Sequence, residues 1–191
     1  MPRAGLTRER VVDAAAQVAD AEGLDAVTLA RLAAQLGVRP PSLYKHVENL
    51  DAVRRGLAVR GLAEANRRLQ LATVGKARDE ALFALAEAYW RFARERPGLY
   101  AASLRAARPD EDDVAAAGEA PLATVLAVLS GYGVGEADAL HATRGLRAII
   151  HGFVSLDAAG GFRLPLDLEE SFRRLLGAFA RDLAARGRAA A

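Results

Sequence analysis

Apolar residues recur along the chain at the three- and four-residue spacing of an α-helix, and no stretch alternates as a strand requires. Residues 29–36 show the pattern plainly, because Leu29, Leu32, Ala33 and Leu36 fall on one helical face. Alanine and leucine, both strong helix formers, fill the segments between glycines and prolines. The spacing therefore predicts an all-α protein.

Capping residues and helix breakers set the expected ends of these helices. Thr7 is placed to open the first helix, and Gly23 follows it. Thr28 opens a second, short helix that Gly37 ends, and Asn49 opens a long fourth one. The expected helices cover residues 7–22, 29–36, 41–47, 50–71, 78–96, 120–130, 135–157 and 168–186, with a further short piece around 99–104.

The helical pattern breaks at residues 72–76, where we expect a domain boundary. A small N-terminal domain is expected over residues 1–71 and a larger helical domain over residues 75–191. The acidic run at 110–113 lacks the spacing of a calcium-binding EF-hand, so we expect a solvated loop there. The glycines at 131, 133 and 135 have no strand before them, which favours a hinge over a phosphate-binding loop.

Two short helices joined by a glycine turn and preceded by a bracing helix are the arrangement of a helix-turn-helix. Such a recognition helix needs an apolar inner face for anchorage and an outer face of hydrogen-bonding and cationic groups. Leu43 and Val47 are the expected anchors, and Val38 is expected to pack the turn. The outer residues are Ser42, Tyr44, Lys45 and His46, with Arg39 just ahead of them.

The charge and composition of the chain limit the functional classes to which it can belong. The net charge is only +2, yet residues 31–60 carry six basic side chains against two acidic ones. This segment suits a polyanionic partner, although ordinary surface charge is the simpler explanation from composition alone. The absence of cysteine excludes a disulfide framework and thiolate metal sites. No run approaches 18 apolar residues and no signal-type stretch opens the chain, so we expect a cytoplasmic protein without a membrane span.

Residues 28–53 resemble the DNA-binding domain of the TetR family of bacterial transcriptional regulators. The family pattern is matched by Thr28, Leu32, Ala33, Leu36, Gly37, Val38, Leu43, Tyr44, His46 and Val47. The resemblance implies that Thr28 and Tyr44 contact phosphates. It also implies that Arg39, Pro40, Pro41, Ser42, Lys45 and His46 face the major groove. Leu50 departs from the pattern, because the family usually has a phosphate-binding lysine there, and Arg54 and Arg55 are the candidates to replace it.

The resemblance also implies that the larger domain binds an effector and forms a homodimer. Two helices carry wide apolar stripes that suit a four-helix interface. Periodicity alone suits a monomer core equally well, and the resemblance favours the interface. The candidate interface residues are Leu146, Ile149, Ile150, Leu168, Phe172, Leu175, Leu176, Phe179 and Leu183.

Residues 144–176 resemble the C-terminal domain type called WHG. The likeness is carried by Arg147, Ala148, His151, Gly152, Phe153, Leu156, Gly160, Phe162, Ser171 and Phe172, with Ile150 in place of the tryptophan. Effector sites are mostly apolar with sparse polar groups. The pocket candidates are therefore Phe83, Tyr89, Trp90, Phe92, Tyr100, His141, His151, Phe153 and Phe162, although core packing is the simpler explanation for any single aromatic among them. His141 and His151 lack a carboxylate ligand set, so no metal is expected.

Other functional classes find less support. The sequence has no G-x-S-x-G elbow, P-loop or H-E-x-x-H motif, so an enzyme is not expected. A helical adaptor would explain the amphipathic helices but not the outer surface of residues 39–46. We expect a homodimeric regulator, a repressor by resemblance, that binds a palindromic operator in double-stranded DNA. A small, largely apolar effector is expected to release it, and no cofactor is expected. An activator would have the same sequence features.

Overall fold

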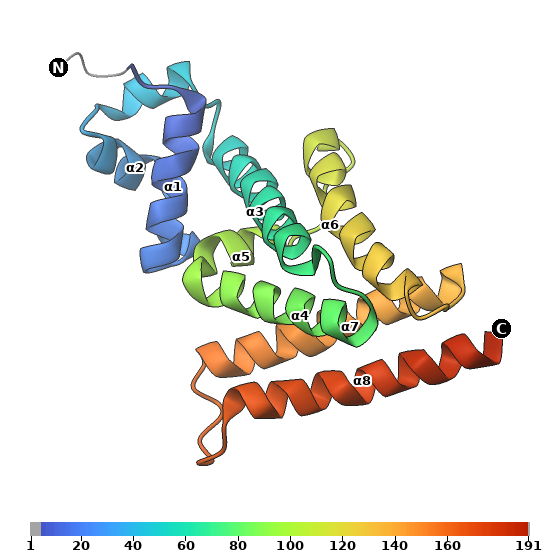
Figure 1. Cartoon of the computed structure of the whole chain (residues 1–191). Coiled ribbons are helices and arrows are strands. Elements are labelled where there is room, and N and C mark those ends of the chain that lie inside the picture. The colour runs from blue at the N-terminus through green and yellow to red at the C-terminus, as the bar shows by residue number, and fades with distance from the viewer. Residues whose placement is uncertain (1–4, 191) are drawn as a thin grey trace. The chain divides into compact units, whose positions relative to one another are not determined.

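The computed structural model describes residues 5–190, and within them it consists of α-helices and short 3₁₀ helices without a strand (Figure 1). The all-α prediction is confirmed, with most helix ends within two residues of those expected. In chain order the elements are α1 (Arg8–Glu22), η1 (Leu24–Ala26), α2 (Leu29–Leu36), η2 (Pro40–Lys45), α3 (Leu50–Thr73), α4 (Arg78–Glu95), α5 (Pro97–Ser103), α6 (Asp112–Ser130), α7 (Glu136–Ala158) and α8 (Leu168–Ala190).

Helix α6 corrects one expectation, because it begins at Asp112 rather than near residue 120. Asp112 and Asp113 occupy its first turn, where carboxylates interact favourably with the helix dipole. The Asp113 carboxylate also accepts a hydrogen bond from the backbone N–H of Val114 at 2.8 Å. The alanines at 115–117 then continue the helix, so the acidic run is a helix start rather than a solvated loop.

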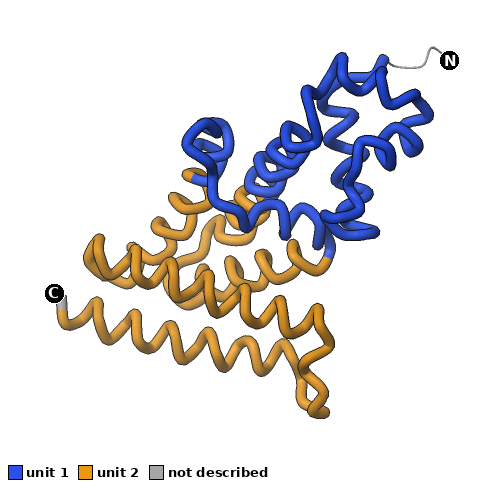
Figure 2. The backbone as a smooth tube through the Cα atoms, turned by 180° about the vertical axis from the view of Figure 1, so that it is seen from behind, with its two compact units in different colours: residues 1–64, 95–118 blue, residues 65–94, 119–191 orange. Residues whose placement is uncertain are grey.

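The helices group into two compact units that do not follow the order of the chain (Figure 2). The first unit contains residues 1–64 and 95–118, and the second contains residues 65–94 and 119–191. Helices α3 and α6 therefore contribute to both units, whereas α5 belongs wholly to the first. The boundary expected at residues 72–76 falls inside the second unit, between α3 and α4.

Helix α5 joins the first unit because a side chain of α1 caps its start. The Asp20 carboxylate accepts hydrogen bonds from the backbone N–H groups of Gly98 at 2.9 Å and Leu99 at 3.2 Å. The same carboxylate pairs with the Arg96 guanidinium at 2.6 Å. A Cβ atom at Gly98 would overlap the backbone of Ala19, so the backbones of α1 and α5 are in direct contact. A single carboxylate thus satisfies the free N–H groups of α5 and fixes it against α1.

The chain after α5 is tied to α3 through a buried carboxylate. Glu111 is only 1% exposed and accepts two hydrogen bonds from the Arg105 guanidinium, at 2.7 and 2.8 Å. It also accepts the backbone N–H of Arg108 at 3.0 Å, and the Arg108 guanidinium pairs with Asp51 of α3. The hydrogen bonds from Arg105, followed by that from the Arg108 backbone, lower the pKa of Glu111 from 4.5 to about 2.

Aromatic side chains form the core of the second unit. Trp90 of α4 lies with its ring centroid 5.2 Å from that of Phe153 on α7 and 5.0 Å from that of Phe172 on α8. Phe162, in the loop between α7 and α8, packs on Phe153 at 4.7 Å. The Trp90 indole donates to the Asp157 carboxylate at 3.0 Å, so its polar edge is satisfied. These contacts join α4, α7 and α8.

Helix α6 reaches a mean hydropathy of 1.4 over an 18-residue window, so by length and composition alone it could cross a membrane. Only 17% of that window is buried within the protein. Polar contacts are made along the helix nonetheless, since Asp113 pairs with Arg55 at 2.7 Å and Thr124 donates to Asn66 at 2.8 Å. One apolar helix is weak support for a membrane span.

Replacing Gly98 with alanine should lower the free energy of unfolding by about 1–3 kcal/mol, because the added methyl group meets the Ala19 backbone. Gly118→Ala is the matched control, since nothing lies within 4 Å of a Cβ at this α6 position. There alanine should stabilise the helix by about 0.5–1 kcal/mol. Chemical denaturation of both variants measures the difference. Equal effects would show that α5 is not packed directly on α1.

Glu111→Gln should remove a pH-dependent contribution to stability. The folded-state pKa of Glu111 is depressed to about 2, so this contribution is complete above its usual 4.5 and is lost as pH falls toward 2. Thermal unfolding followed by circular dichroism between those pH values should show a steeper loss for the original chain than for Glu111→Gln. Glu119→Gln, at an exposed α6 position, should keep the steeper loss. Identical profiles for all three proteins would contradict the assignment.

Candidate nucleic-acid interface

Helix α2 is fixed at both ends by local hydrogen bonds. The Thr28 hydroxyl accepts the backbone N–H of Arg31 at 3.1 Å, which caps the helix start. At the other end Gly37 adopts φ 66°, a left-handed conformation that favours glycine. The Val38 N–H then bonds back to the Ala33 carbonyl at 3.0 Å. The glycine turn predicted from the sequence is therefore present, and it aims the chain into η2.

The recognition segment is a 3₁₀ helix, η2, rather than the α-helix expected at residues 41–47. Pro40 and Pro41 lack N–H donors, and their fixed φ angles suit the first turn of either kind of helix. The Ser42 N–H bonds to the Arg39 carbonyl and the His46 N–H to the Leu43 carbonyl, both at 2.9 Å and both three residues apart. The segment is consequently tighter and shorter than predicted.

The predicted inner and outer faces of this segment are nevertheless in place. Leu43 is 0% exposed and Val47 is 4% exposed, as anchors should be. Tyr44 is 59% exposed, which is unusual for a large aromatic side chain and suits contact with a partner. Among the remaining candidates, Thr28, Arg39, Pro40, Pro41 and Lys45 are exposed, and Ser42 and His46 are half-buried.

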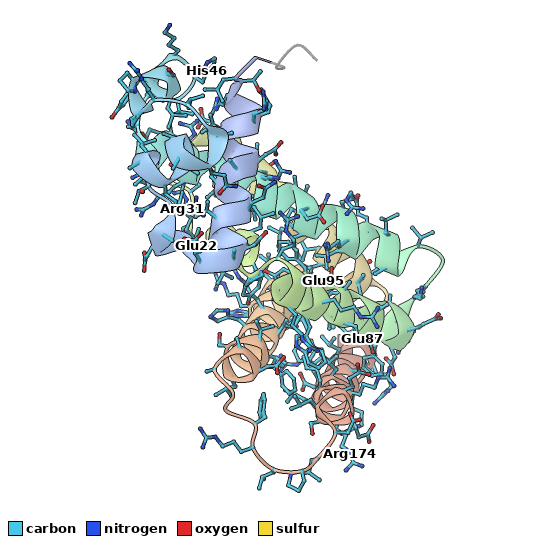
Figure 3. The ribbon with its side chains drawn as sticks, turned by 90° about the vertical axis from the view of Figure 1, so that its left-hand side faces the viewer. Glu22, Arg31, His46, Glu87, Glu95 and Arg174 are labelled. Atoms are coloured by element: carbon cyan, nitrogen blue, oxygen red, sulfur yellow. The ribbon has the colours of Figure 1, made fainter. Side chains whose placement is uncertain are left out.

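Two cations of this surface are free of carboxylates, whereas the cation of α2 is not. Arg31 pairs with Glu22 at 2.6 Å. Figure 3 shows that this pair lies apart from His46 within the first unit. Within the described residues, Arg39 and Lys45 have no ion pair. Their charge is therefore available to an anionic partner such as the phosphate backbone of a nucleic acid.

The effector-pocket candidates occupy several different environments. Trp90, Phe153 and Phe162 come together in the aromatic cluster of the second unit. Phe92 and Tyr100 are also buried, but Tyr100 lies on α5 and so in the first unit. Phe83 and Tyr89 are half-buried, whereas His141 and His151 are exposed. Among the described residues, no group of three or more His, Cys, Asp or Glu is placed to hold a metal ion.

A cavity of about 450 Å³ in the second unit lies between the end of α3, the start of α4 and the end of α6. Its lining includes Val74, Ala81, Thr124 and Val128, and none of the aromatic candidates. Arg78 shapes one wall, with φ 49° and its guanidinium donating to the Gly131 carbonyl at 3.2 Å. Small and polar residues far apart in the chain line this cavity, so the sequence held no local signal for it.

The candidate interface residues divide by burial. Five of them lie in the core of their own chain, namely Leu146, Ile150, Phe172, Leu176 and Leu183. These five side chains are packed within their own chain, and their assignment to an interface stays a prediction. Leu175 is 41% exposed, and Ile149, Leu168 and Phe179 are half-buried. Leu140 and Leu156 of α7 are 45% and 52% exposed, and the sequence pattern did not single them out as interface residues.

Comparison with protein families gives two matches. Residues 11–49 match the family described as bacterial regulatory proteins, tetR family. Residues 82–179 match the family described as tetracyclin repressor-like, C-terminal domain, while the likeness to the WHG type stays a prediction. The first match spans α1 to the start of α3, and so covers the helix-turn-helix and its bracing helix.

Relatives and solved structures agree with these matches. An uncharacterised HTH-type transcriptional regulator of Bacillus subtilis, YobS, is 42% identical over 170 residues, which are 89% of this chain and 88% of that protein. A protein of unknown function from Rhodococcus superposes with a TM-score of 0.81 at 25% identity, covering 96% and 98% of the two chains. A TetR variant from Acinetobacter baumannii in complex with minocycline has a TM-score of 0.71 at 22% identity, covering 95% and 98%, and shares the fold.

Proposed function

Because the chain belongs to the tetR family of bacterial regulatory proteins, we propose that it is a repressor that binds a palindromic operator as a homodimer and leaves it when an effector binds. Members of this family are transcriptional regulators that bind DNA and respond to ligands. The finer proposal rests on one observation above others. A short segment, anchored by Leu43 and Val47, holds Tyr44, Lys45 and Arg39 in solvent.

This surface suits DNA better than a protein partner. In the proposed complex η2 enters the major groove, and Thr28 and Tyr44 hold phosphates on either side through their hydroxyl groups. Arg39 and Lys45 are long enough to reach either a guanine edge or a phosphate. Ser42 and His46, half-buried beside them, add hydrogen-bonding groups at the base of the segment. An adaptor that binds another protein would not require two unpaired cations within seven residues.

The homodimer is proposed to form through the outer faces of α7 and α8. Leu156 near the end of α7 and Leu175 near the start of α8 expose large apolar side chains, and a second copy would cover them. A two-fold dimer carries two recognition segments related by the same symmetry. Its operator is then palindromic, with half-site centres about 34–36 Å apart or a multiple of that distance.

The effector is proposed to bind in the second unit and to be small and largely apolar. Two places there suit such a ligand: the aromatic cluster around Trp90 and Phe153, and the cavity of about 450 Å³ beside Arg78. The structural relative from Acinetobacter baumannii was solved in complex with a small molecule, minocycline. An effector that favours a conformation unable to bind DNA weakens operator binding through linkage, by about 1–3 kcal/mol in typical cases.

Lys45→Ala should weaken binding to a duplex selected from random DNA by about 1–3 kcal/mol if Lys45 reads a base. If Lys45 instead holds a phosphate, the variant should reduce the dependence of affinity on salt. Fluorescence anisotropy with a labelled duplex distinguishes the two. Arg163→Ala, at an exposed position between α7 and α8, is the control and should bind as the original chain does. Failure of the original chain to enrich any sequence would contradict operator binding.

Leu175→Glu should convert the dimer to a folded monomer, because it places a charge on the proposed apolar interface. Light scattering coupled to size exclusion measures the mass. Phe172 is unsuitable for this test, since it is 1% exposed and a charge there would disrupt the core. Ala116→Glu, at an exposed α6 position, should leave the dimer intact. A folded Leu175→Glu protein of unchanged mass would place the interface elsewhere.

A further inference from the structure

The cations of the first unit divide into those with carboxylate partners and those without. Arg8 lies near enough to Glu9 and Asp113 to lower the pKa of both carboxyl groups, and Arg10 donates to the Gly5 carbonyl. The remaining pairs are Arg31–Glu22, Arg55–Asp113, Arg60–Asp13, Arg96–Asp20, Arg105–Glu111 and Arg108–Asp51. In the part of this unit that the structure describes, the exposed side chains of Arg39, Lys45 and Arg54 make no ion pair.

This division matters for contact with a polyanion. A guanidinium that already holds a carboxylate must give up that pair before it can neutralise a phosphate. An unpaired cation releases only mobile counterions from the phosphate, and this release drives binding. Arg39 and Lys45 already belong to the proposed DNA surface. The third member of the set, Arg54, lies outside η2.

The position of Arg54 places it beside the recognition segment. It lies in the second turn of α3, and only residues 46–49 separate that helix from η2. The Asn49 side chain caps α3 by accepting the Ala52 N–H at 2.8 Å. Side chains of a helix lean toward its N-terminus, so the Arg54 guanidinium extends over the turn that contains Leu50. The positive end of the α3 dipole lies at that same turn.

Nearby carboxylates leave a positive balance around this turn. Asp51 is paired with Arg108, and Asp113 is paired with Arg55. Glu48 is the one exposed acidic residue in the short connection between η2 and α3. Its single negative charge stands against the three positive charges of Arg39, Lys45 and Arg54, so the remaining charge is positive. A phosphate that approaches the start of α3 therefore meets an attractive field.

We propose that Arg54 binds a DNA phosphate beside the groove that η2 enters, and that the adjacent Arg55 does not. The proposal rests on the proposed function, since it requires that the first unit binds DNA. It assigns different roles to two neighbouring arginines. Arg54 contacts the nucleic acid, and Arg55 holds the start of α6 through Asp113.

The test compares Arg54→Ala with Arg55→Ala in the whole chain. Anisotropy with a labelled mixed-sequence duplex of about 30 base pairs, from about 50 to 200 mM KCl, gives the slope of log affinity against log salt. Each phosphate contact contributes about 0.9 to that slope, so Arg54→Ala should reduce it by about 1.8 for a dimer. Over this fourfold range the original chain should then lose roughly 12-fold more affinity than the variant does.

Three controls make the result decisive. Arg55→Ala should keep the original slope, and Arg54→Lys should restore it, whereas Arg54→Gln should match Arg54→Ala. An unchanged slope in a folded Arg54→Ala protein would overturn the inference and leave the proposed function standing. An equal loss in Arg55→Ala, or a loss in Arg54→Lys, would overturn it as well. Absence of any binding by the original chain at about 50 mM salt would instead overturn the proposed function.

Discussion

Burial of Leu43 and Val47 positions the segment that is proposed to enter the DNA groove. The recognition segment η2 has only six residues, and a 3₁₀ helix of that length has too few hydrogen bonds to persist alone. It is held because Leu43 and Val47 are buried and because η2 packs against α2. Once Leu43 and Val47 are buried, Tyr44 and Lys45, which lie between them in the sequence, are exposed to solvent. The polar chemistry of the site thus depends on an apolar contact behind it.

Ion pairs of the first unit serve a different purpose from its free cations. The Asp20 carboxylate attaches α5 to α1, and the Asp113 carboxylate attaches the start of α6 to α3. The Glu111 carboxylate holds the segment between α5 and α6 through Arg105. Through these contacts residues 95–118, which follow α4 in the sequence, belong to the first unit. The chain therefore crosses between the two units within α3, between α4 and α5, and within α6. Linkage between an effector and DNA would require two conformations of the chain that the two ligands bind with different affinities.

Local signals in the sequence were sufficient for the helix-turn-helix. Thr28, Gly37 and Leu43 act through neighbours within a few positions, so their roles could be predicted from spacing alone. The 3₁₀ form of η2 was not predicted, because proline is accepted in the first turn of an α-helix and apolar spacing does not distinguish the two helix types over so short a segment. Assignments that depend on distant residues could not be predicted: Asp20 meets Gly98 across 78 positions, and periodicity does not distinguish a core role for Phe172 from an interface role. Likewise, the acidic run gave no sign that Glu111 is buried on Arg105.

Hydrogen–deuterium exchange with and without a selected DNA duplex tests the central claim most directly. The account predicts that DNA slows amide exchange at the start of α2 and through η2, because those segments lie against the duplex. Amides of the second unit that are remote from the DNA should change less. Protection confined to the second unit, with η2 unaffected by a duplex that binds, would contradict the assignment of this anchored segment as the DNA-binding surface.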